Sequence, residues 1–132
     1  MEKTQVKAYL KIVGNDFIHE NITNIIGVLP EKAWTKGELF KGNLIRNFSH
    51  WSYGTNYEES LDIMEQIRYV VDQFYDKVDV LKELKSNFDL EFYISVVIQI
   101  YNNQVPGIVI DKEAVRFAYS IGAEFDIDTY IY

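Results

Sequence analysis

Alternating apolar and polar positions predict three long strands in this chain. In residues 6–13, 90–101 and 123–132 every second side chain is apolar, and most of the residues between them are charged, polar or tyrosine. Successive strand residues point to opposite faces of a sheet, so this period of two predicts strands with one buried face. Residues 90–101 are rich in β-branched and aromatic side chains, which favours a central position in the sheet.

Two short helices are predicted near the ends of the chain. Residues 19–26 place isoleucines at helical spacing, and Gly27 follows where a left-handed residue commonly ends a helix. Asp111 is a suitable cap for a helix over residues 112–121, which Gly122 would end.

Helical spacing is clearest in the middle of the chain. Ser60 is the expected N-cap, and the apolar stripe begins at Leu61 and continues to Phe74. After a break near Asp76, a second and shorter helix is expected to end at Asn87.

The remaining segments predict shorter strands. Residues 28–57 are irregular, with one strand expected over residues 45–53. Residues 105–110 predict an edge strand, because Pro106 near its start cannot donate a ladder hydrogen bond.

This order of elements predicts a single α+β domain over residues 1–132. Short connections and right-handed crossovers would place all helices on one side of one sheet. The expected fold is a two-layer α/β sandwich, ferredoxin-like or related, with a mostly antiparallel sheet.

Composition is consistent with a folded cytoplasmic protein. The chain is 48% hydrophobic and 15% aromatic, and it contains no cysteine. Disulfides and thiolate sites are therefore excluded, and the lack of disulfides fits a reducing cytosol. No segment resembles a signal peptide, and no apolar run approaches the length of a membrane span.

Charge is distributed unevenly along the chain. Residues 1–56 hold seven Lys/Arg and five Asp/Glu, a balance of +2, whereas residues 57–132 hold six and fifteen, a balance of −9. An acidic balance repels nucleic-acid phosphates and speeds the encounter with basic proteins. It is also common among soluble bacterial proteins, where it serves solubility alone.

No catalytic signature is present. The chain lacks the serine-hydrolase elbow, the dinucleotide and P-loop glycine motifs and the zinc-protease motif. Its two histidines, His19 and His50, fall in different elements. The sequence therefore predicts no catalytic residue, no metal ligand set and no cofactor.

Three carboxylates on the last strand form the most distinctive chemical pattern. Glu124, Asp126 and Asp128 are spaced by two, so they should project from one face. Three interpretations stay open: a solvated acidic face, a contact surface for a protein, and a cation site of a metal-dependent hydrolase.

Tyrosines join these carboxylates on the face that helices would leave open. The expected partner-binding residues are Tyr9, Tyr93, Tyr101, Glu124, Asp126, Asp128 and Tyr130. Tyrosine is enriched at protein interfaces, although cross-strand pairs of tyrosine, lysine and aspartate also stabilise an exposed sheet without any partner.

A second candidate surface lies in the irregular segment. Trp34, Lys36 and Trp51 would line a pocket for a small ligand, because tryptophan beside basic residues binds anions or stacks on rings. The alternative is that both tryptophans cover the core beneath a long loop.

Several short runs resemble a bacterial family known as domain of unknown function 4279. The matching runs are Tyr9–Gly14 with Asp16 and Phe17, residues 27–30 with Trp34 and Gly37, Trp51, Pro106–Ile110, and Ile121–Tyr130. The resemblance implies a small bacterial cytosolic protein, and some members are candidate immunity or antitoxin proteins. It implies no activity, cofactor or site residue.

The preferred hypothesis is a non-enzymatic protein-binding module, with an immunity-type protein that neutralises a basic toxin as its most specific form. A small-ligand sensor is the alternative, and a metal-dependent hydrolase built on the last strand is the second alternative.

Overall fold

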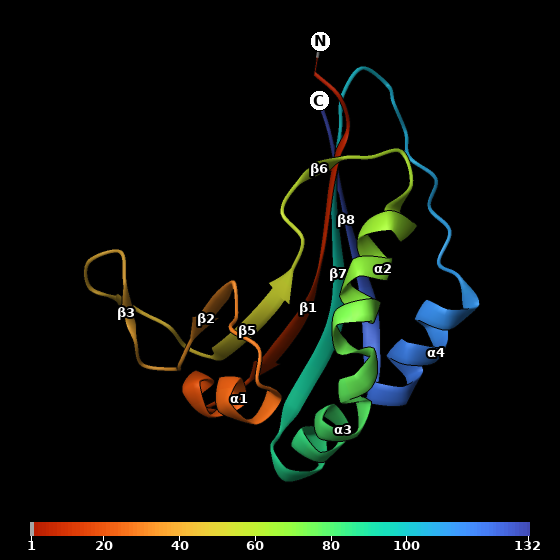
Figure 1. Ribbon diagram of the computed structural model, residues 1–132. Coiled ribbons are helices and arrows are strands. Elements are labelled where there is room, and N and C mark those ends of the chain that lie inside the picture. Colours follow the sequence, from red (N-terminus) through yellow and green to blue (C-terminus); the bar gives the residue numbers. More distant parts are fainter. Residues whose placement is uncertain (1) are drawn as a thin grey trace.

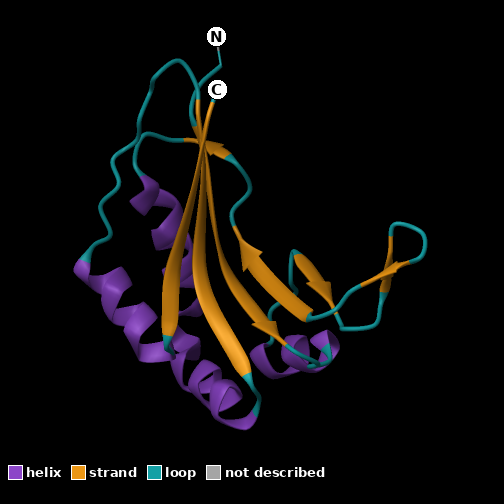
Figure 2. Cartoon of the chain, turned by 180° about the vertical axis from the view of Figure 1, so that it is seen from behind, coloured by secondary structure: helices purple, strands orange, loops and turns teal. Residues whose placement is uncertain are grey.

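One twisted sheet and the helices that cover one of its faces make up the structure (Figures 1 and 2). The computed structural model describes residues 2–132. Seen from behind, the strands lie in front of the helices, so the second face of the sheet carries no helix (Figure 2). The predicted two-layer α+β sandwich is confirmed.

Eight strands and four α-helices are described within residues 2–132. The strands are β1 (Gln5–Gly14), β2 (Lys32–Trp34), β3 (Leu39–Phe40), β4 (Leu44–Ile45), β5 (Ser49–Gly54), β6 (Glu58–Glu59), β7 (Leu90–Ile100) and β8 (Ala123–Ile131). The helices are α1 (His19–Ile26), α2 (Ile63–Phe74), α3 (Val78–Asn87) and α4 (Lys112–Ile121), and a 3₁₀ turn (Tyr75–Lys77) connects α2 to α3.

The main sheet has the strand order β2-β5-β1-β7-β8, and β6 pairs with the start of β1. All neighbours are antiparallel except β7 and β8, which are parallel and connected through α4. Strands β3 and β4 form a separate hairpin that extends away from the sheet (Figure 1). The mostly antiparallel sheet is therefore also confirmed.

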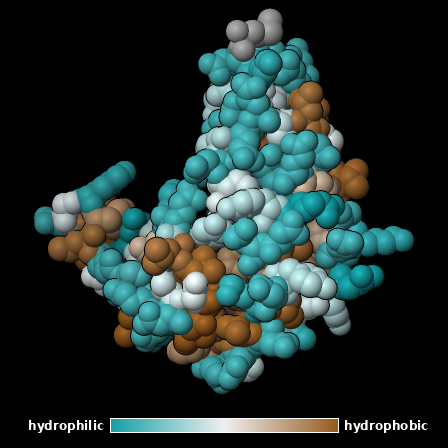
Figure 3. Space-filling view, viewed as in Figure 1, coloured by the Kyte–Doolittle hydropathy of each residue, from teal (hydrophilic) through white to brown (hydrophobic). Residues whose placement is uncertain are grey.

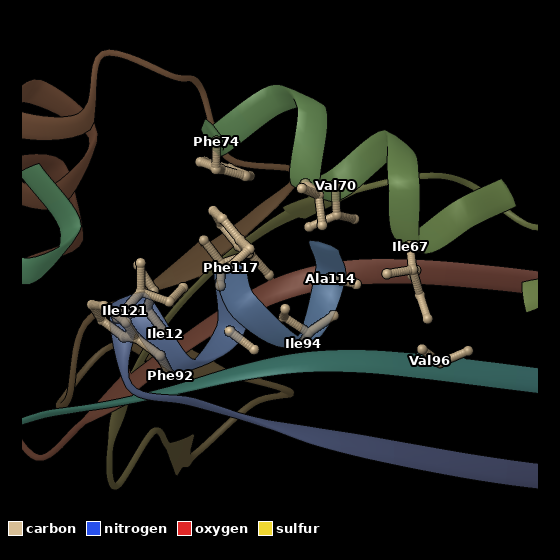
Figure 4. Packing of buried hydrophobic residues seen from close by; sticks show 14 of the residues in the cluster. Ile12, Ile67, Val70, Phe74, Phe92, Ile94, Val96, Ala114, Phe117 and Ile121 are labelled. Atoms are coloured by element: carbon tan, nitrogen blue, oxygen red, sulfur yellow. The ribbon is translucent and has the colours of Figure 1, made fainter. Parts of the chain in front are cut away.

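The core lies between the sheet and the helices. Val6, Ala8, Leu10 and Ile12 of β1 are fully buried, as are the alternate residues of β7. Figure 4 shows Ile67 of α2 pointing toward Val96 of β7. Burying a side chain of this size contributes roughly 1.5–3 kcal/mol to folding, so this layer contact is the main source of stability.

The predicted boundaries of α1 and α4, the helices nearest the two chain termini, agree with the structure. Helix α1 ends at Ile26, and Gly27 adopts a left-handed conformation with φ of 79°. Asp111 caps α4, because its side chain accepts a hydrogen bond from the Ala114 backbone nitrogen at 2.9 Å.

The predicted cap of the long helix was wrong. Asp62, not Ser60, caps α2, and its Oδ1 accepts from the Met64 nitrogen at 3.0 Å. The Ser60 hydroxyl instead donates to the Asp62 carbonyl at 2.9 Å and so helps to hold the capping residue Asp62 in place. Leu61 consequently lies outside the helix and is exposed.

Two predicted short strands were also placed wrongly. Residues 105–110 form no strand; their backbone pairs with the segment before α2 through a bridge between Gly107 and Asp62. The strand expected over residues 45–53 is divided between β4, in the projecting hairpin, and β5, in the main sheet.

Exposed apolar residues gather around α1 and the β3–β4 hairpin (Figure 3). The members of this group are Ile18, Ile25, Leu29, Leu39, Leu44, Ile45 and Phe48; other exposed apolar residues, such as Leu61 and Val109, lie elsewhere. Within residues 2–132, no helix has both the length and the apolar character needed to cross a membrane.

Candidate functional site

The uncovered side of the sheet, which we call the open face, is built by strand pairing. In β1, the residues between the core positions point to this side, and Lys7, Tyr9 and Lys11 are opposite Val97, Ser95 and Tyr93 of β7. The same β7 residues are in register with the carboxylates of β8. Residues far apart in the sequence therefore form continuous rows across the open face.

The acidic stripe of the open face consists of Glu124, Asp126 and Asp128. These residues are in register with Tyr93, Ser95 and Val97, and so project from one face as predicted. Lys11 reaches the middle of the stripe, where its Nζ lies 3.8 Å from an oxygen of Asp126. Glu124 and Asp128 are exposed, so the stripe presents negative charge to solvent at an edge of the sheet.

The acidic stripe does not have the geometry of a metal site. Within residues 2–132, no three histidine or carboxylate side chains come together closely enough to hold a metal ion. Side chains at every second position of a strand point to the same side about 7 Å apart, so their oxygens do not converge on one point.

The four predicted tyrosines lie on the open face together with the acidic stripe. Tyr9 and Tyr93 lie in the rows that end at Asp126 and Glu124. Tyr130 follows along β8 and is half exposed, while Tyr101 stacks on Tyr132 with ring centroids 4.8 Å apart. The structure therefore brings all seven predicted partner-binding residues onto one face.

A basic cleft occupies the other half of the open face. It has a volume of about 550 Å³ and lies among β1, β2, β5 and the segment after β4. Its lining includes Lys7, Tyr9, Lys32, Trp34, Arg46 and His50. The open face thus carries opposite charges on its two halves, with Lys11 on the boundary.

Aromatic rings hold the side chain of Arg46 at this cleft. Its guanidinium carbon lies 3.8 Å from the ring centre of Trp34 and 4.0 Å from that of Phe40. Trp34 in turn stacks on the His50 ring, with centroids 4.2 Å apart and planes inclined by 12°. Cation–π contact and stacking therefore order a charged group that would otherwise be mobile.

His50 is buried beneath the cleft, and its Nε2 shares a hydrogen bond of 2.9 Å with the Ser52 hydroxyl. Burial, aided by the positive charges of Lys11, Lys32 and Arg46, lowers the pKa of His50 to about 4. The imidazole is therefore neutral at pH 7, and the positive charge of the cleft comes from its lysines and its arginine.

The lowered pKa of His50 predicts that the folded protein loses stability in acid. Because the pKa in the folded state is about 4, below the ordinary value of about 6.5, the unfolded chain binds the proton first as the pH falls. The stability that neutral His50 contributes is therefore complete above pH 6.5 and declines as the pH falls toward 4. We expect the melting temperature of the wild type to fall more steeply over this window than that of His50→Gln.

The direct measurement is the NMR titration of the His50 ring, which should have its midpoint near pH 4. A midpoint near the ordinary value, or equal slopes for the two proteins, would contradict the burial of a neutral imidazole.

The predicted ligand pocket of Trp34, Lys36 and Trp51 does not exist as a group. Trp51 is fully buried on the helix side of the sheet, where its Nε1 donates to the Thr23 hydroxyl at 3.0 Å. Lys36 points to Asn15, with its Nζ 3.5 Å from the side-chain oxygen. Of the three residues, only Trp34 lines the basic cleft.

Sequence reasoning placed Lys32 and Arg46 near Trp34 as basic residues that could bind an anion, but it missed Lys7 and His50 as members of the same site. Lys7, Lys32 and His50 come from three strands that the pairing of β2 with β5 and of β5 with β1 brings together. Arg46 lies between β4 and β5 and joins them through its contact with Trp34. Two sequence signals pointed to the site: the basic residues near Trp34 and the +2 balance of the first 56 residues.

Comparison with known proteins identified one family. The family model described as Domain of unknown function (DUF4279) matches residues 4–132. No curated protein and no solved structure matches the chain.

Proposed function

We propose that the chain, which belongs to the DUF4279 family, acts as a non-enzymatic protein-binding module. Its contact surface is the acidic stripe with the neighbouring tyrosines, and its partner is a basic protein. The observation that carries the proposal is the convergence of all seven predicted residues on a face that no helix covers.

Charge supports a basic partner. The acidic stripe lies at the sheet edge, and residues 57–132, which contain it, have a balance of −9. A concentrated negative field accelerates encounter with a positive surface and disfavours acidic competitors.

Tyrosine supports a protein rather than a small cation as the bound species. Tyr93 is in register with Glu124, and Tyr130 follows Asp128 along β8. Tyrosine supplies a large contact area with little rotamer entropy to lose. Strand β8 also has a neighbour on one side only, so its outer edge is available to pair with a strand of the partner.

An immunity-type protein is the most specific form of this function. Such a protein blocks a toxin by covering a basic functional surface, and it needs no catalytic residue of its own. The sequence contains no catalytic motif, and the acidic stripe has the charge that such a partner requires.

Charge reversal on the stripe tests the proposal. We expect Asp126→Lys/Asp128→Lys to weaken the captured partner's affinity at least about 10-fold, because two attractive contacts become repulsive. The measurement is affinity capture from the native host, followed by titration of the recovered partner at two salt concentrations. Wild-type binding should weaken as salt rises.

The matched control is Asp72→Lys/Glu83→Lys, which makes the same change of charge at exposed positions of α2 and α3 on the helix side. It should leave the affinity within about 2-fold of the wild type. Recovery of no partner, or equal losses in both double variants, would contradict the proposed surface.

A further inference from the structure

The basic cleft is a formed concavity rather than a flat region of the sheet. Its volume of about 550 Å³ lies within the range of roughly 300–1,000 Å³ that is typical of small-molecule sites. Three strands and the segment that carries Arg46 form its walls. A ligand could therefore contact several elements at once.

Positive charge in the cleft exceeds the negative charge that lines it. Lys7, Lys32 and Arg46 contribute three cations, and Glu31 is the one carboxylate among the lining residues. Within residues 2–132, none of these three cations has a carboxylate oxygen within 4 Å. Burial and then the charge of Lys32 lower the pKa of Lys7, as expected for cations that share a small space.

Neutral donors lie beside these cations. In the tautomer with its proton on Nε2, the uncharged His50 ring donates to the Ser52 oxygen and leaves the Ser52 hydrogen available to another acceptor. The Thr55 hydroxyl oxygen accepts from the Ala8 nitrogen at 3.1 Å, which leaves its own hydrogen available to another acceptor. The cleft therefore combines three cations with hydroxyl donors, and this donor set matches the oxygens of an anion.

Trp34 does not offer a stacking platform to a ligand in the cleft. His50 stacks against Trp34 with its ring 4.2 Å away, and the guanidinium of Arg46 lies over the same ring at 3.8 Å. Two groups this close to one ring must occupy its two faces, so no base or other planar ring can stack on Trp34. The cations and hydroxyl groups of the cleft, and not the Trp34 ring, are therefore available to a ligand.

We infer that the basic cleft binds a small anionic molecule through its phosphate or carboxylate oxygens, which Lys7, Lys32 and Arg46 contact. Trp34 and Phe40 hold Arg46 in position, and Ser52 and Thr55 supply neutral donors. The acidic stripe takes no part in this binding; Tyr9 is the residue that the cleft shares with the proposed partner surface.

Thermal stability in the presence of simple anions tests the inference. Inorganic phosphate and succinate are added to the full chain, with KCl keeping the ionic strength constant. We expect at least one of them to raise the melting temperature saturably, by about 5 °C at ten times its Kd. A response to phosphate alone or to succinate alone identifies which oxyanion the cleft prefers.

Single-charge variants locate the binding site. Lys32→Gln and Arg46→Gln should each lower the affinity for the effective anion about 10-fold. Lys82→Gln removes the same charge from an exposed position of α3 and should leave the affinity unchanged. The double variant Asp126→Lys/Asp128→Lys should retain anion binding, which separates this inference from the proposed partner surface.

Two results would overturn the inference. One is the absence of a saturable shift with either anion up to tens of millimolar. The other is an equal loss of affinity in Lys82→Gln and Lys32→Gln, which would show a response to net charge and not to the cleft.

Discussion

Alanine at Gly54 is expected to destabilise the protein by about 3 kcal/mol or more and to lower its melting temperature by roughly 10 °C. Gly54 ends β5 opposite Tyr9 of β1. A Cβ atom there would lie 2.1 Å from the Ala8 carbonyl oxygen and 2.4 Å from the Tyr9 Cα. Because these are backbone atoms, the strands must separate to accommodate it, and the measurement is a thermal or urea melt.

Separation of the strands would disturb hydrogen bonds on both sides of the contact. The Thr55 nitrogen donates to the Ala8 carbonyl at 2.8 Å, and the Ala8 nitrogen donates to the Thr55 hydroxyl at 3.1 Å. These bonds are buried in the middle of the sheet, where a broken pair costs about 1–3 kcal/mol.

Gly107→Ala is the matched control. Its Cβ would meet only the Leu61 oxygen at 3.7 Å, an ordinary contact, so a change within about 1 kcal/mol is expected. If Gly54→Ala were as stable as Gly107→Ala, the close approach of β5 to β1 would be refuted.

The long strands could be predicted from sequence because their pattern repeats many times. Strand β7 begins at Leu90, as predicted. The bounds of α1 and α4, the two helices that a glycine follows, were predicted within one residue. Over such lengths alternation leaves one choice of buried face, since a slip of one residue would exchange every core and surface position.

The basic cleft could not be predicted in the same way. Strand β2 has only three residues, and its register with β5 places Trp34 beside His50 and Ala33 beside Trp51. A shift of one residue would have put the two tryptophans together. Composition alone therefore grouped Trp34 with Trp51, whereas strand pairing assigns them to opposite faces.

The acidic stripe was predictable because all its residues belong to one strand. Their spacing of two determines a common face without knowledge of any neighbour. The basic cleft required four segments to be placed relative to one another, and that information resides in pairing across the sheet.

Trp51→Ala is expected to destabilise the protein by about 3–5 kcal/mol. The side chain is fully buried, packs edge-on against Phe74 with centroids 6.2 Å apart, and donates to the Thr23 hydroxyl. Alanine would leave a cavity where β5, α1 and α2 meet and would remove the donor that holds Thr23. Chemical denaturation measures the loss.

Two further substitutions divide this effect into its causes. Thr23→Val removes the hydrogen-bond acceptor while keeping the volume, and should cost about 1 kcal/mol; the remainder of the Trp51 effect is then packing.

Trp34→Ala should cost less than Trp51→Ala, because Trp34 is only partly buried on the open face, but it should weaken anion binding by releasing Arg46. If Trp34→Ala proved the more destabilising of the two tryptophan variants, the assignment of Trp51 to the core side of the sheet would be wrong. The two tryptophans therefore report on different layers: Trp51 on the cohesion of sheet and helices, and Trp34 on the order of the cleft.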